Sequence, residues 1–144
     1  MTEVQIITDS TTDIPPDLVG RLGITVIPCL VRFGEKFYRD GVDLTREAFY
    51  ALLSKSPVAT SQPAVGVFEQ MYRQAAERGR QIISIHTAGK LSGIYNAACT
   101  AAHSFPQAVI EIIDTHSASL GAGLLVVAAA EEALLLQSLG AIAA

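Results

Sequence analysis

The stretch that decides the fold runs from residue 81 to residue 93 and reads QIISIHTAGKLSG. Its first six residues are mainly β-branched and apolar, as in a buried strand. A glycine-containing loop follows, and a helix is expected from about Ser92 to Ala102. The stretch therefore predicts the order strand, polar loop, helix.

The same order occurs twice more in the chain. A β-branched run at residues 4–8 precedes a polar loop at residues 9–13 and a short helix. Residues 109–113 form another apolar strand, which the loop 114–117 connects to a last helix running from about Ser119 toward the C-terminus. This alternation predicts βαβ crossovers and an α/β fold of three layers, in which a mostly parallel sheet is flanked by helices.

The segment after the first helix is less regular. Residues 24–33 are rich in strand-forming side chains, with Pro28 marking an edge or a bulge. Gly34-Glu35 indicates a tight hairpin, and a helix capped by Thr45 is expected to end near residues 56–57.

Two short stretches place small hydroxyl residues where a helix is expected to begin. Thr60-Ser61-Gln62-Pro63 precedes a helix that Gly79 closes, and Ser92-Gly93 opens the helix after the fold-deciding strand. Free N–H groups and the positive end of the helix dipole favour an anion there. The stretches predict a pocket for a carboxylate or phosphate, although helix capping alone explains such residues equally well.

Ligands of parallel sheets bind beyond the carboxyl ends of the strands. Four loops are expected near this rim, at residues 9–13, 60–63, 86–93 and 114–119. Ser10, His86 and Ser117 are secondary candidates for ligand contacts in these loops. The competing explanations are turn formation for residues 9–13 and an ordinary hydrogen-bonded loop histidine at position 86.

Length and charge limit the class of partner. With 144 residues, half of them hydrophobic, the chain is expected to form one compact domain. A net charge of −4 and scattered basic residues give no reason to bind nucleic acid.

The cysteines and the apolar C-terminal region bear on localisation. Cys29 and Cys99 lack CxxC spacing, and no secretory leader is recognised before the first strand, which predicts a cytoplasmic protein. Residues 119–144 are strongly apolar, but Glu131-Glu132 lies in their middle. A soluble helix is therefore expected instead of an integral membrane segment.

Known catalytic and cofactor motifs are not recognised. Gly89-Lys90 is not followed by the hydroxyl residue of a phosphate-binding loop, and the three histidines lack zinc spacing. No Gly-x-Ser-x-Gly elbow exists. We expect no cofactor and no metal. The alternative that remains is an enzyme of phosphoryl or acyl transfer that uses Asp9 or His86 at the rim.

Five blocks of the sequence together resemble the N-terminal domain of the DegV family, bacterial proteins that bind long-chain fatty acids. Each block is weak alone, and their order and spacing are specific. They lie at residues 7–15 (ITDSTTDIP), 33–45 (FGE and YRDGVDLT), 60–63 (TSQP), 91–95 (LSGIY) and 113–119 (IDTHSAS).

The resemblance implies an α/β domain that covers residues 1–144 and binds a long-chain fatty acid such as palmitate. Thr60 and Ser92, with Ser61 and Gly93 beside them, would hold the carboxylate. It further implies a lipid carrier in fatty acid metabolism or transport, without chemistry of its own. In related proteins the bound acid is presented to a separate kinase.

Two departures from the family pattern lead to expectations. Ala88-Gly89 and Ile94 replace hydroxyl residues that usually flank the Lys-Leu-Ser-Gly block, so some head-group contacts are expected to be lost. The family's second domain is missing from the sequence, which predicts weakened or absent fatty-acid binding. The apolar C-terminal helix indicates a surface for that domain or for a second copy in a homodimer.

Overall fold

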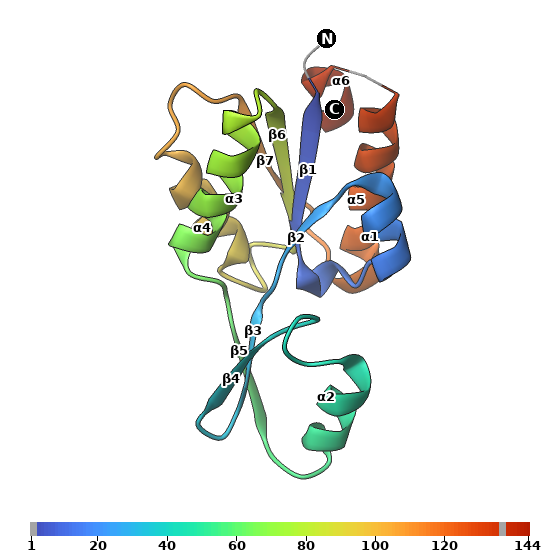
Figure 1. Ribbon diagram of the computed structural model, residues 1–144, viewed down its shortest axis with the longest axis vertical. Helices are drawn as coiled ribbons and strands as arrows, with labels where there is room; N and C mark the ends of the chain where they lie inside the picture. Colours follow the sequence, from blue (N-terminus) through green and yellow to red (C-terminus); the bar gives the residue numbers. More distant parts are fainter. Residues whose placement is uncertain (1–2, 136–137) are drawn as a thin grey trace.

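The computed structural model describes residues 3–135 and 138–144 and contains two sheets (Figure 1). In chain order the elements are β1 (Val4–Asp9), the 3-10 helix η1 (Ser10–Thr12), α1 (Pro16–Leu22), β2 (Thr25–Ile27), β3 (Leu30–Phe33), β4 (Lys36–Arg39), α2 (Arg46–Leu53), β5 (Val58–Ser61), α3 (Val65–Glu77), β6 (Gln81–His86), α4 (Ile94–Ala102), β7 (Ile110–Asp114), α5 (Ser119–Leu134) and α6 (Leu139–Ala143).

The main sheet is parallel, with the strand order β2-β1-β6-β7. Ile7 of β1 pairs with Ser84 of β6, and His86 pairs with Asp114 of β7. The two central strands β1 and β6 are buried along almost their whole length because helices cover both faces. The predicted parallel α/β fold of three layers is confirmed.

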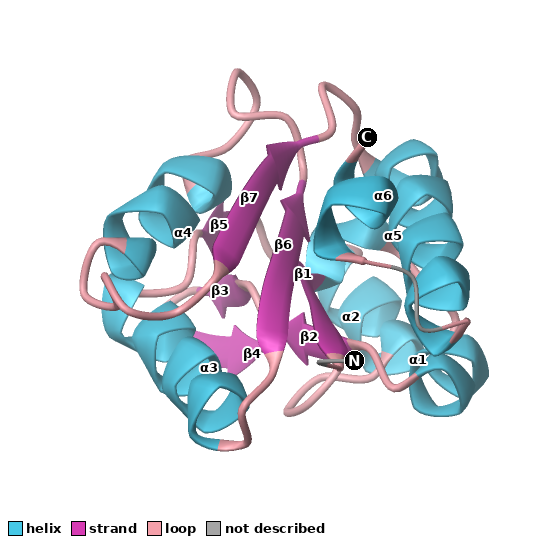
Figure 2. Cartoon of the chain, turned by 90° about the horizontal axis from the view of Figure 1, so that it is seen from above, coloured by secondary structure: helices cyan, strands magenta, loops and turns pink. Residues whose placement is uncertain are grey.

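The two faces of the main sheet have separate apolar cores. Helices α3 and α4 cover one face, where Phe68 and Tyr72 pack against Ile7 and Ile82. Helices α1, α5 and α6 cover the other face, as seen along the sheet in Figure 2. A β-carbon on Gly123 of α5 would overlap the backbone carbonyl of Thr12, so α5 touches η1 closely.

A small lobe, residues 30–61, projects from the carboxyl ends of the main strands (Figure 1). It holds the antiparallel sheet β4-β3-β5 and helix α2. Its core centres on Val31, Phe33 and Leu44, and the rings of Phe33 and Phe49 meet edge to face with centroids 5.8 Å apart. The predicted hairpin is confirmed: Phe33 pairs with Lys36 across a two-residue turn.

Two features of this region were not specified by the sequence pattern. Residues 24–33 do not form one strand, because the chain leaves the main sheet at Pro28-Cys29, between β2 and β3. Pro28 has no N–H to continue a ladder, so the run is divided between the edges of two sheets. Strand β5 was not expected, since Val58–Ser61 is short and gains its hydrogen bonds only by pairing with β3.

The expected single C-terminal helix is divided into α5 and α6, with residues 136–137 outside the described part. Ser138 caps α6 by accepting a hydrogen bond from the Ala141 N–H, and Ile142 packs half-buried against the main sheet. Exposed apolar side chains lie along α5, at Leu120, Leu124 and Leu125 in its first half and at Leu134 and Leu135 at its end.

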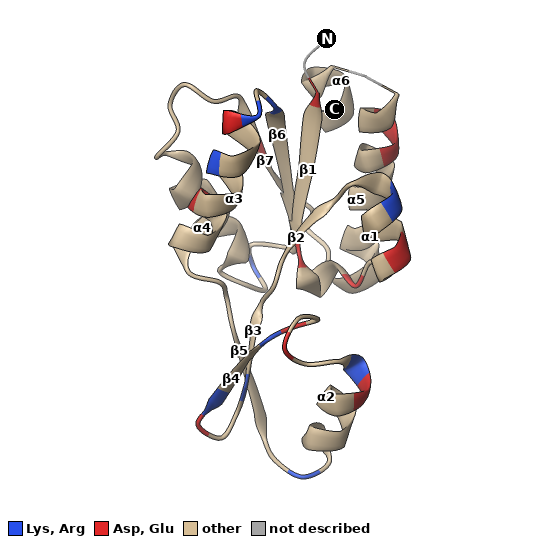
Figure 3. Cartoon of the chain, in the orientation of Figure 1, with Lys and Arg blue, Asp and Glu red and all other residues tan. Residues whose placement is uncertain are grey.

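Charges are spread over the surface. Figure 3 shows Lys and Arg interspersed with Asp and Glu on the helices and the small lobe. Across residues 3–135 and 138–144, no helix combines the length and the apolarity needed to cross a membrane.

Candidate functional site

Three parallel strands end at one edge of the main sheet, with Asp9, His86 and Asp114 as their last residues. We call this edge the rim, together with the loops 9–13, 87–93 and 114–119 that leave it. Hydrogen bonds join the loop 87–93 to each of the other two loops, which confirms the expectation that these three loops meet.

Loops 87–93 and 114–119 are tied to each other at the backbone. Ala88 N–H donates to the Ser117 carbonyl over 2.8 Å, and Gly89 N–H donates to Asp114 Oδ2 over 3.2 Å. Thr115 Oγ1 donates to the His86 carbonyl at 2.9 Å. Backbone donors from His116 and Gly89 hold the pKa of Asp114 below its ordinary value. The contact that Ser117 makes here comes from its main chain.

Asp9 and His86 are placed at the strand ends as expected, but neither side chain is exposed at all. His86 Nδ1 lies 2.8 Å from Asp9 Oδ2, and Thr11 donates to Asp9 Oδ1 from both its N–H and its hydroxyl. Burial alone would raise the pKa of Asp9, but these hydrogen bonds and the His86 charge outweigh it and lower the pKa. His86 is therefore part of the interior and is not accessible to a ligand.

The other ring nitrogen of His86 faces inward as well. Its Nε2 lies 2.7 Å from Ser84 Oγ, which accepts a 2.9 Å hydrogen bond from the Tyr72 hydroxyl. Asp9, His86 and Ser84 thus have the order of contacts of a catalytic triad. Ser84 is fully buried, however, so no substrate reaches it in this conformation. The arrangement offers no support for an enzyme that uses Asp9 or His86.

Ser92 and Gly93 lie on the rim just before α4. Ser92 is half-buried, and its Oγ accepts a long 3.4 Å hydrogen bond from Ile94 N–H. Among the described residues no acceptor takes the Ser92 hydroxyl hydrogen, which leaves it free to donate. Gly93 is the N-cap of α4 and supplies no side-chain cap, so after Ile94 N–H the next N–H groups of the first turn have no side-chain partner among the described residues.

The second hydroxyl stretch has a different local structure from the one expected. Thr60 and Ser61 end strand β5, whereas α3 begins at Val65 with Ala64 as its N-cap. They are therefore not the start of a helix. Both are exposed, and because successive strand residues point to opposite sides, only one of them can face a given ligand. Thr60 pairs with Val31, whose side chain belongs to the core of the small lobe.

The two stretches meet at Gln62, for which the sequence predicts no role of its own. The side-chain amide of Gln62 packs against Gly93, where a β-carbon would overlap it. Thr60 is two residues away, a span of about 7 Å at most along the chain. The contact therefore brings Thr60 and Ser92 to the same end of the molecule. No sequence pattern singles out Gln62 beyond its place in the Thr-Ser-Gln-Pro block.

The Ser10 side chain makes a structural hydrogen bond within the fold. Its Oγ accepts a 3.1 Å hydrogen bond from Cys29 N–H, which joins the rim to the segment that leads into the small lobe. Burial, with a smaller contribution from Asp9, raises the pKa of the Cys29 thiol to about 11. Cys29 is thus a protonated, buried side chain at neutral pH.

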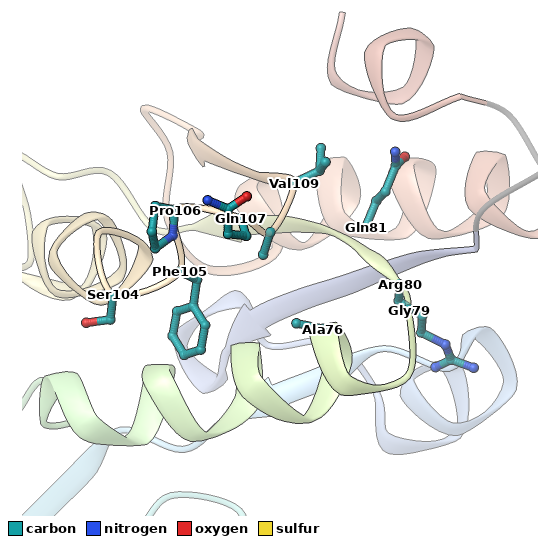
Figure 4. Close-up of a pocket in the computed structure, with 10 residues that line it drawn as sticks. Ala76, Gly79, Arg80, Gln81, Ser104, Phe105, Pro106, Gln107 and Val109 are labelled. Atoms are coloured by element: carbon teal, nitrogen blue, oxygen red, sulfur yellow. The ribbon is translucent and has the colours of Figure 1, made fainter.

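A cavity of about 590 Å³ lies at the opposite end of the main sheet (Figure 4). It is lined by Arg80, Phe105 and Val109, among others, from the end of α3 and the loop before β7. The Arg80 guanidinium is already paired with Glu3 at 2.8 Å and with Gln5. The cavity is remote from the hydroxyl residues and from the rim.

The fold and the rim define a class of α/β protein that has accessible hydroxyl groups where its parallel strands end and a small antiparallel lobe beside them. The family described as "Uncharacterised protein, DegV family" matches residues 3–144. The chain belongs to the DegV family.

Relatives and solved structures agree with this assignment. A DegV domain-containing protein of Deinococcus radiodurans is 39% identical over 130 residues, which are 89% of this chain and 46% of the relative. A fatty-acid-binding DegV family protein of Thermus thermophilus has a TM-score of 0.88 at 39% identity, covering 98% of this chain and 51% of the other. A stearic-acid-binding protein of Eubacterium ventriosum has a TM-score of 0.87 at 28% identity, covering 99% and 50%.

The chain therefore spans about half the length of the relatives and structures that it matches. The proteins from Thermus thermophilus and Eubacterium ventriosum are described as binding fatty acids.

Proposed function

We propose that this chain supplies the carboxylate-binding half of a long-chain fatty-acid site. Ser92 and Thr60 donate hydrogen bonds to the carboxylate, with the backbone at Gly93 beside them, and Ser61 takes the place of Thr60 if the opposite side of β5 faces the ligand. The observation that carries the proposal is the packing of Gln62 on Gly93, which brings the two hydroxyl stretches together. The fatty acids named for similar structures supply the ligand class.

Neutral donors suit this ligand. A carboxylate accepts short, charge-assisted hydrogen bonds from hydroxyl and N–H groups, and no second charge has to be buried beside it. The free hydroxyl hydrogen of Ser92 and the uncapped N–H groups in the first turn of α4 supply such donors. A lysine is also near, because Lys90 belongs to the same loop.

The acyl chain requires apolar cover. Burying it contributes about 0.8 kcal/mol for each CH₂ group. We propose that part of this cover comes from a second domain, which would correspond to the other half of the relatives. We therefore expect residues 1–144 alone to bind palmitate weakly. The exposed leucines near the start of α5, at positions 120, 124 and 125, are available for that domain or for a second copy of this chain.

The proposed role is that of a carrier. The bound acid would be presented to a separate kinase, or moved between sites of lipid metabolism, without chemistry on this chain. The full burial of Ser84 and His86 supports this role over that of a hydrolase or transferase.

The test is a titration with palmitate followed by amide NMR, which measures weak binding directly. We expect shifts at Ser92, Gly93 and Thr60, and a loss of affinity of about tenfold in Ser92→Ala, the effect of one hydrogen bond to a charged group. Ser54→Ala is the matched control, because Ser54 is an exposed hydroxyl at the end of α2. Equal affinities for Ser92→Ala and the unchanged chain would contradict the proposed head-group site.

A further inference from the structure

We propose that Thr11 and Thr87 are positioning residues, whose hydroxyl pair sets the position of the loop that carries Ser92 and Gly93. This inference rests on the proposed fatty-acid site for its effect on binding. Its structural part concerns the rim alone and can be tested without ligand.

The pair joins two loops that are far apart in sequence. Thr11 Oγ1 lies 2.6 Å from Thr87 Oγ1, so η1 and the loop 87–93 meet at this point. Thr87 is only 4% exposed, and Thr11 is half-buried. A hydrogen bond shielded from water in this way is costly to leave unmade. The loop 87–93 is thereby attached to β1 as well as to β7.

The available hydrogens give this pair a direction. The ionised Asp9 carboxylate only accepts, so the Thr11 hydroxyl hydrogen points to Asp9 Oδ1. The Thr87 hydroxyl must then donate to Thr11 Oγ1. Thr87 consequently has no hydroxyl hydrogen left for a bound carboxylate.

The same reasoning applies on the other side of Asp9. The Tyr72 hydroxyl donates to Ser84 Oγ, which lies 2.7 Å from His86 Nε2. His86 Nδ1–H then donates to Asp9 Oδ2. Thr11 in η1 and His86 at the end of β6 thus both donate to one buried carboxylate. This carboxylate sets the orientation of the Thr11 hydroxyl. The Thr11 oxygen in turn accepts the hydrogen bond from Thr87 and so holds the Thr87 side chain in place.

The position of Thr87 determines where the following turn, at residues 88–92, is placed. Thr87 is succeeded by Ala88, whose carbonyl accepts hydrogen bonds from Leu91 N–H at 2.9 Å and from Ser92 N–H at 3.2 Å. The turn that carries Ser92 is therefore built directly on Thr87. Movement of Thr87 displaces the proposed carboxylate donor without removing any atom of it.

The experiment compares Thr87→Val with Thr87→Ser. Valine has the shape of threonine without the hydroxyl, whereas serine restores the hydroxyl. In the absence of ligand, we expect the amides of Ala88, Leu91 and Ser92 to exchange with solvent about fivefold faster in Thr87→Val, as for one lost hydrogen bond. Thr87→Ser should return the exchange toward that of the unchanged chain.

Thr8→Val is the matched control. Thr8 is also a buried threonine, but its Oγ1 donates to the Ile85 carbonyl at 2.7 Å and otherwise reaches only Thr12 Oγ1 at 3.5 Å, so it has no hydrogen bond to the described residues of the loop 87–93. We expect Thr8→Val to lower the midpoint of urea unfolding and to leave exchange at Ser92 unchanged. Faster exchange at the rim in both variants would overturn the positioning role, because general destabilisation would then explain it. Unchanged exchange in Thr87→Val would also overturn it.

Binding adds a second readout. Palmitate affinity should fall severalfold in Thr87→Val and recover in Thr87→Ser. If the unchanged chain shows no palmitate shifts at all, the proposed fatty-acid site fails, while the exchange data still decide the role of Thr87. A different outcome is that palmitate binds equally well to Thr87→Val although its loop amides exchange faster. The hydroxyl pair would then order the loop without affecting ligand affinity, and the proposed effect on binding would be overturned.

Discussion

The side-chain amide of Gln62 lies so close to Gly93 that a β-carbon at position 93 would fall 2.8 Å from Gln62 Cδ. The backbone of Gly93, with φ −73° and ψ 1°, is open to any residue. Glycine is therefore required here for space and not for conformation. The contact joins the end of β5, in the small lobe, to the start of α4 on the main sheet.

Gly93→Ala is expected to displace Gln62 and leave the fold intact. Because a flexible side chain can move aside, we expect the free energy of unfolding to change by less than about 1 kcal/mol. Palmitate affinity should fall, since the two hydroxyl stretches separate; NMR titration measures this. Gly66→Ala on α3, where a β-carbon meets open space, is the control and should not affect binding. Unchanged affinity in Gly93→Ala would show that Gln62 does not set the spacing.

Gly123→Ala is expected to destabilise the protein. A β-carbon at position 123 would overlap the Thr12 carbonyl, which is backbone and cannot rotate away. Helix α5 would have to move off η1, at a cost of about 1–3 kcal/mol. Urea unfolding measures this change. Gly20→Ala in α1, with nothing near its β-carbon, should be neutral or stabilising. Equal unfolding midpoints for the two variants would refute the close packing.

Tyr72→Phe is expected to cost about 1 kcal/mol of unfolding free energy. The ring keeps its place in the core, whereas the hydrogen bond to Ser84 is lost. Burial raises the pKa of the Tyr72 hydroxyl, which remains a donor at all moderate pH values. Tyr50→Phe is the control because Tyr50 is 62% exposed. A cost no greater than that of the control would mean that the Tyr72 hydrogen bond contributes nothing net.

The buried Asp9 carboxylate makes stability depend on acid pH. Its pKa in the folded chain lies below its ordinary value of 3.8, so the unfolded chain takes up the proton first as the pH falls. The stabilisation is therefore complete above about pH 5 and is lost as the pH falls through the folded-state pKa. Asp9→Asn should flatten this part of the stability curve measured by urea unfolding.

A second carboxylate with a lowered pKa provides the control for this prediction. The Arg39 guanidinium and N–H lower the pKa of exposed Asp43 to about 2. Because this pair faces solvent, added salt should weaken its effect. The effect of Asp9, which is fully buried, should persist in salt. A pH dependence that salt removes altogether would assign it to surface pairs and contradict the prediction for Asp9.

The sequence by itself determined the elements whose signals are local. The apolar runs at residues 4–8, 81–86 and 109–113, each ahead of a polar loop and a helix, were sufficient to predict a parallel sheet and the edge where its loops meet. Gly34 likewise marked its hairpin turn. These features depend on periodicity and on backbone freedom, which are properties of neighbouring residues.

Only the tertiary structure decided which side chains at the rim are exposed. His86 ends a strand as predicted, yet its ring turns inward because Asp9 and Ser84, from β1 and β6, bind both of its nitrogens. Strand β5 exists because β3 offers it hydrogen bonds, and Gln62 gains its place only where α4 begins. Such contacts join segments distant in sequence and depend on burial and pairing, so no local pattern records them.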